Sequence, residues 1–114
     1  PAAGLELSAF VENLDKLPDI DAIVRGEKVR VPKETDLQYA VAAALVGRAI
    51  RAKSEDNADE IYGRILEFAG TFPQREMGVM LVSDMYRAIG QDIFNVPQFS
   101  KWDNIVADVM LYDS

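Results

Sequence analysis

The sequence contains neither cysteine nor histidine. Without cysteine the chain can form no disulfide bond and offers no thiolate ligand to a metal. Without histidine it lacks the side chain that most often serves as a general base or a metal ligand near neutral pH. These absences exclude Cys/His metal sites and nucleophilic sites that pair serine or cysteine with histidine. The lack of cysteine also fits a reducing compartment, so we expect a cytoplasmic protein.

Basic residues and long apolar runs are also scarce. The chain has 12 Lys and Arg against 19 Asp and Glu, which gives a net charge of −7. Such a charge disfavours nucleic acid and anionic membranes as partners. The longest apolar runs, near residues 39–46 and 77–82, are far shorter than the ~20 residues that span a bilayer. We therefore expect no nucleic-acid partner and no membrane partner.

Recognised phosphate-binding motifs are missing as well, because neither G-x-x-x-x-G-K-[ST] nor G-x-G-x-x-G occurs. Carboxylates are numerous, but they fall at expected helix caps and on exposed faces, which disfavours an enzyme built on a carboxylate pair. We expect this chain to carry no catalytic residue, no metal and no cofactor of its own.

The 114 residues, 49% of them hydrophobic, are enough for one globular domain over 1–114. A domain of this length buries roughly 65% of the surface that its unfolded chain exposes. The sequence begins at Pro1 without methionine. We therefore expect a processed product or a fragment of a longer protein.

Residues 35–53 form the most apolar segment, and we expect them to be the central helix. Nearly every position from Leu37 to Val46 is apolar, which is typical of a helix inside a bundle. Thr35 and Gln38 have the spacing of a capping box, in which each side chain satisfies an amide of the first turn.

Apolar spacing predicts further helices on both sides of this segment. Asp19 and Asp21 follow Pro18, and we interpret them as cap and dipole residues in preference to a metal or acid pair. The expected helices cover residues 5–16, a short piece after Pro18 that stops at Gly26, residues 57–69, a segment from Pro73 to Gly90, and a final segment from Pro97. The fold class is therefore all-α, a compact bundle of five to six helices around the buried helix at about 35–53.

The loop over residues 26–34, together with the residue just before it, carries the one basic cluster of this acidic chain: Arg25, Lys28, Arg30 and Lys33. One interpretation is a docking patch for an acidic partner or for phosphate. The other, which we favour, is a solvated loop whose charge Glu27 and Glu34 disperse, since the glycine-rich geometry of a phosphate site is missing.

Two sets of apolar residues also allow two interpretations each. Three methionines between Pro73 and Gly90 either fill the core or line an adaptable groove, and we favour the core. Phe99 and Trp102 either close the bundle, which we favour, or form an exposed aromatic patch for a partner. The candidate partner contacts are Arg25, Lys28, Arg30, Lys33 and Trp102.

Two stretches, residues 9–45 and 72–111, together resemble the region that follows the ATPase core in MoxR-like AAA+ ATPases. The first contains LPDIDAI, then a Val-Pro turn and an alanine-rich helix. The second contains a proline-started helix with an apolar run and a helix with an F-x-x-W motif. The matching residues are Phe10, residues 17–23, Val31, Pro32, residues 39–45, Pro73, residues 80–82, Phe99, Trp102 and residues 107–109.

The resemblance implies that the chain is a non-catalytic C-terminal helical domain. ATPases of this family hydrolyse ATP in ring assemblies and act like chaperones, often with partners that contain von Willebrand A domains. Their nucleotide-binding motifs lie upstream, so ATP and magnesium are expected only for the full-length protein. The implied partners are its own ATPase core, neighbouring subunits and a von Willebrand A-domain protein. The alternative is a free-standing helical adaptor.

Overall fold

A computed structural model describes residues 14–113 of the chain, and within them it contains helices but no strand. The α-helices are α2 (Ile20–Val24), α3 (Thr35–Ala52), α4 (Ala58–Ala69), α5 (Arg75–Ile89) and α6 (Asp103–Asp113). Three 3-10 helices accompany them, η1 (Leu14–Lys16), η2 (Gly90–Asn95) and η3 (Pro97–Lys101). The predicted all-α fold is confirmed. The helix expected over residues 5–16 lies outside the described residues except for η1.

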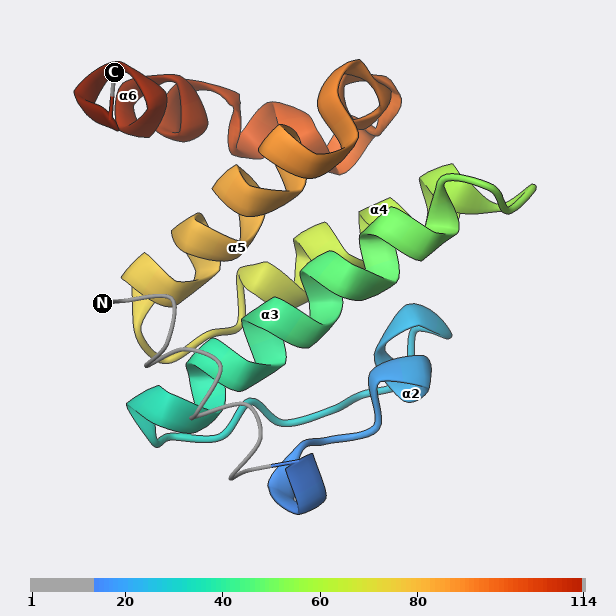
Figure 1. The fold of residues 1–114 in the computed structure, drawn as a ribbon, viewed down its shortest axis with the longest axis vertical. Helices are drawn as coiled ribbons and strands as arrows, with labels where there is room; N and C mark the ends of the chain where they lie inside the picture. Colours follow the sequence, from blue (N-terminus) through green and yellow to red (C-terminus); the bar gives the residue numbers. More distant parts are fainter. Residues whose placement is uncertain (1–13, 114) are drawn as a thin grey trace.

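Helix α3 runs through the middle of the molecule, with α2, α4 and α5 packed against it (Figure 1). Its Val41, Leu45 and Ala49 side chains have 0% of their surface exposed. The small side chains of Ala42, Ala49 and Ala52 lie in the same core and leave room for neighbouring helices to approach closely. The prediction of a buried central helix is thus confirmed.

The predicted capping box at the start of α3 is wrong. Glu34 occupies the N-cap position without a side-chain cap bond, and its carbonyl accepts the Gln38 amide at 3.0 Å. Gln38 is therefore the fourth helical residue, one position too late for a capping box, and its side chain faces the interior. The Thr35 hydroxyl instead donates to Oε1 of Gln74 at 2.8 Å.

The interpretation of Asp19 as a cap residue is confirmed. Its carboxylate accepts the Asp21 amide at 3.0 Å and the Ala22 amide at 3.3 Å, so it satisfies two free N–H groups of the first turn of α2. Gly26, with φ +86°, follows the C-cap residue Arg25. This left-handed conformation favours glycine, which explains why α2 stops here.

The C-terminal third of the chain covers one end of the bundle. The predicted helix after Pro73 begins at Arg75, and η2 follows it before Val96. The final segment is divided into η3 and α6, with Phe99 and Trp102 both buried. Trp102 is 4% exposed, so it closes the bundle, as the favoured interpretation expected.

Two glycines in α3 and α5 provide a matched test of the packing. A Cβ atom on Gly78 would overlap the carbonyl oxygen of Ala69, whereas a Cβ on Gly47 would meet nothing within 4 Å. We expect Gly78→Ala to lower the free energy of unfolding by about 2 kcal/mol, because the α4–α5 contact must open. Gly47→Ala should raise it by about 0.5–1 kcal/mol, because alanine stiffens a helix interior. Urea denaturation of both variants checks this, and two changes of the same sign would contradict it.

Candidate functional site

Three of the four basic residues singled out in the sequence line one concave surface. Lys28, Arg30 and Lys33 surround a hollow of about 780 Å³, and the remaining lining residues are Val29, Val31, Thr71 and Pro73. We call these seven residues the basic surface. Val29 and Val31 are covered while Lys28 and Arg30 are exposed, the alternation of an extended backbone. The valines thus anchor the loop while the cations remain in solvent.

The cations of the basic surface are not neutralised within the described part of the chain. No described acidic side chain lies within 4.0 Å of the Lys28, Arg30 or Lys33 charges. Glu27 neutralises the fourth cation of the sequence cluster, Arg25, with Oε2 2.6 Å from Nε of Arg25, and does not pair with the other three. The positive field of the three cations is therefore open to a partner.

Arg25 is separate from this surface. Besides Glu27, it lies 3.7 Å from the Asp19 carboxylate. The hydrogen bond to Glu27 raises the pKa of the Arg25 guanidinium. The sequence cluster of four cations therefore divides into three open cations and one that is paired within its own turn.

Gln38 connects the basic surface to the core. Its side chain is buried in α3, and Nε2 donates to the carbonyl oxygen of Lys33 at 3.0 Å. This bond fixes the end of the basic loop against the central helix. Its Oε1 atom is buried and has no hydrogen-bond partner within residues 14–113, so burial at this position has a cost.

Trp102, the fifth candidate contact, does not form an exposed aromatic patch. The indole ring belongs to the core, and the exposed Lys101 lies beside it, with Nζ 5.6 Å from the ring centroid. The structure therefore contradicts the exposed-patch interpretation at Trp102, because its aromatic surface is used in closing the bundle.

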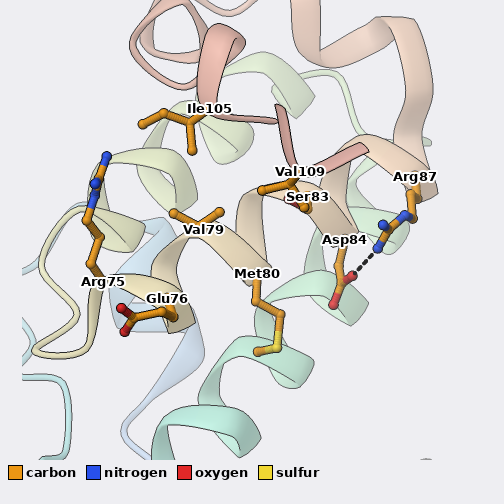
Figure 2. A pocket seen from close by; sticks show the side chains of 9 residues that line it. All are labelled: Arg75, Glu76, Val79, Met80, Ser83, Asp84, Arg87, Ile105 and Val109. Carbon is orange, nitrogen blue, oxygen red and sulfur yellow. Dashed lines mark hydrogen bonds and ion pairs between the residues drawn. The ribbon is translucent and has the colours of Figure 1, made fainter. Parts of the chain in front are cut away.

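A groove between α5 and α6 is a second hollow surface, and the candidate residues chosen from the sequence did not include it. It encloses about 390 Å³ (Figure 2). Four apolar side chains, Val79, Met80, Ile105 and Val109, line it. Charged residues complete the lining: Arg75, Glu76, Asp84 and Arg87, with Arg87 3.2 Å from Asp84. We call this the α5–α6 groove.

The methionines of α5 serve both roles that the sequence allowed. Met85 is completely buried in the core, and Met77 is partly buried against it. Met80 is partly exposed and lines the α5–α6 groove, so the preference for the core was right for Met85 but incomplete for Met80. Ser83, also in the lining, is 2% exposed and its hydroxyl has no hydrogen-bond partner among the described residues.

An acidic turn follows the C-terminal end of α3 and continues into the first turn of α4. We define it as Glu55, Asp56, Asp59 and Glu60, all exposed. Glu55 is held by Arg48 through bonds of 2.6 Å and 3.2 Å, which lower the pKa of the Glu55 carboxyl and raise that of the Arg48 guanidinium. This ion pair ties the turn to the last turns of α3.

The described part of the chain contains no group of three or more Asp and Glu residues placed to hold a metal ion. Among its helices, none combines the length and the apolar character needed to cross a membrane. Comparison with protein-family models, with curated proteins and with solved structures finds no match to this chain.

The role of Gln38 can be tested by Gln38→Ala. We expect the free energy of unfolding to fall by about 2 kcal/mol, since a buried side chain and its bond to Lys33 are lost. Trypsin should then cleave faster after Lys28, Arg30 and Lys33, because the loop opens locally.

Thr35→Ala is the matched control for this test, because it removes the other residue of the expected capping box. The exposed hydrogen bond from Thr35 to Gln74 should contribute less than ~0.5 kcal/mol to the free energy of unfolding. Equal trypsin cleavage rates in the two variants would show that Gln38 does not hold the loop.

Proposed function

We propose that this chain is a non-catalytic C-terminal helical domain of a MoxR-like AAA+ ATPase and that it mediates assembly or partner contacts. The observation that supports contact formation best is the basic surface. An acidic chain presents three cations on one concave surface, and no described carboxylate neutralises them. Interfaces with charge complementarity of this kind gain specificity and association rate.

The positions of the residues behind the resemblance support a scaffold role for them. Asp19 caps α2, Val31 is buried before α3, and Leu81 and Val82 are buried in α5. Phe99 and Trp102 close the end of the bundle. Residues that maintain caps and core keep a domain's shape, and its exposed surfaces are then free to bind other proteins.

In this proposal, ATP and magnesium bind upstream, in the ATPase core of the full-length protein. The helical domain contacts that core, a neighbouring subunit or a protein with a von Willebrand A domain. Remodelling by the full-length protein would depend on ATP, while this domain would provide contacts and no catalytic group.

The proposal predicts an open reading frame upstream of the Pro1 codon that encodes a Walker A motif followed by an acidic motif. Sequencing the coding DNA upstream of that codon tests this directly. The 114-residue chain alone should show no binding in a calorimetric titration with magnesium-ATP. A start codon directly before Pro1, or tight ATP binding by this chain, would contradict the proposal.

The α5–α6 groove favours the alternative function, a helical adaptor. Its apolar lining between charged ends suits an amphipathic helix of another protein, which would place apolar side chains at i, i+3, i+4 and i+7 into the groove. Met80 provides a side chain that adapts to such an occupant. The Ser83 hydroxyl, which has no partner in the described part of the chain, lies among the lining residues.

Val109→Lys tests the adaptor function, with Ile50→Lys as its control. Val109 lines the groove, whereas Ile50 is a 50% exposed apolar residue of α3 outside it. A fluorescent helical model peptide with leucine at positions i, i+3, i+4 and i+7 should bind the native chain. Val109→Lys should weaken this binding about tenfold, because a charge enters the apolar lining of the groove. Equal affinities for the two variants in fluorescence anisotropy would exclude the groove as the binding site.

A further inference from the structure

The α5–α6 groove follows one face of α5 over most of the helix. Arg75, Val79, Ser83 and Arg87 are spaced four residues apart, and all four line the groove (Figure 2). Because each helical residue adds 1.5 Å, these positions cover about 18 Å. This extent matches about three turns of a second helix lying beside α5, and it exceeds what a small ligand would fill.

At the start of α5 the groove continues into a second hollow of about 280 Å³. Arg75 and Ile105 line both spaces, so the two are contiguous. Lys101 and the aromatic side chains of Phe72 and Trp102 also line the second hollow. Of the described residues in this lining, none is acidic. We call Arg75 and Lys101 the cationic end of the groove.

The positive charges of the cationic end have no ion pair within the described residues. No described carboxylate lies within 4.0 Å of the Arg75 guanidinium or the Lys101 ammonium. Figure 2 shows the Arg75 side chain extended toward Ile105 and away from the Glu76 carboxylate. The charge of Arg75 is therefore directed to the place where the groove and the second hollow meet.

Arg75 is also placed against the dipole of its own helix. It is the first residue of α5, where the free amide groups carry partial positive charge and a cation is unfavourable. The N-cap residue Gln74 makes no side-chain cap hydrogen bond that would reduce this charge. Two positive side chains and a positive helix end thus meet at one end of an apolar groove. An acidic group in the groove would be stabilised by all three.

The opposite end of the groove offers an acidic group much less. Arg87 lies 3.2 Å from Asp84, so a carboxylate of α5 already opposes its charge. The last turn of α5 also carries the negative end of the helix dipole. Between the two ends, the buried Ser83 hydroxyl has no partner within residues 14–113, and a polar side chain of an occupant can bind it. The groove is therefore electrostatically directional.

From this asymmetry we infer that the α5–α6 groove binds an amphipathic helix of another protein that has an acidic last turn and runs antiparallel to α5. The C-terminal end of this helix lies at Arg75 and Lys101, because both its carboxylates and the negative end of its dipole favour cations there. Its apolar stripe contacts Val79, Ile105 and Val109. The inference rests on the helix-binding function proposed for this groove and adds the charge and direction of the partner.

Two labelled peptides test the direction. Each has about 16 residues with leucine at positions i, i+3, i+4 and i+7, and they carry three glutamates either in the last turn or in the first. In fluorescence anisotropy, the peptide with the acidic last turn should bind the native chain about fivefold more tightly at low salt, with a smaller difference at high salt. Glutamates in the last turn make a free peptide less helical, so a preformed helix cannot explain this preference.

Charge reversal then identifies the cations. R75E/K101E should weaken binding of the peptide with the acidic last turn about tenfold, because repulsion replaces attraction. K16E/K53E changes two exposed lysines outside the groove, alters the net charge equally and should weaken binding less than about twofold. A third peptide with lysines in its last turn should bind R75E/K101E about fivefold more tightly than K16E/K53E, although the two variants have the same net charge. Circular dichroism checks that both variants are folded.

Three results would overturn the inference. These are equal affinities of the native chain for the two glutamate peptides, equal weakening by the two double variants, and no preference of the lysine peptide for R75E/K101E. The helix-binding function of the groove stands in each case if Val109→Lys still weakens peptide binding. A native chain that binds neither glutamate peptide would reject that function together with the inference.

Discussion

Close packing of α3 against α5 and α4 is the constraint on which the rest of the structure depends. Alanines at positions 42, 49 and 52 of α3 are buried, so neighbouring helices approach without large side chains between them. Gly78 allows the same closeness between α5 and the end of α4, where Ala69 has its carbonyl oxygen. Leu45, Ile65 and Leu81, all fully buried, come from these three helices and fill the space between them. Dense packing of this kind gives each helix one position and hence fixes where its ends lie.

The positions of the helix ends determine the surfaces. The loop before α3 is held by Val31 in the core and by the bond from Gln38 to Lys33. The turn after α3 is held by the pair between Arg48 and Glu55. Both charged regions are therefore attached to the same central helix at fixed distance.

The α5–α6 groove arises from incomplete coverage of α5. Its Leu81, Met85 and Ile89 side chains are buried, while Val79 and Met80 are only partly covered. Helix α6 covers part of this face through Val106 but leaves Ile105 and Val109 half-exposed. The groove and the basic surface thus involve different elements, and a protein that binds one can leave the other open.

The sequence by itself determined the helical class, the central helix and the spacing of most core positions. Apolar periodicity sufficed at Ile61, Ile65 and Leu66, since burial on one face of a helix leaves a regular pattern. Local chemistry sufficed to predict the start of α2 at Asp19 and its end at Gly26, because capping and a left-handed φ involve only residues close by in the sequence. The same local signals failed at Thr35 and Gln38, where a shift of one residue in the helix start turned Gln38 into the core.

Only the tertiary structure decided which surfaces exist. Thr71 and Pro73 meet Lys28 and Arg30 because α4 returns along α3, a contact between residues far apart in the sequence. Trp102 is buried for the same reason, because its neighbours in the core depend on how the chain folds back. Periodicity gives the buried face of one helix, but a groove such as that between α5 and α6 requires the relative placement of two.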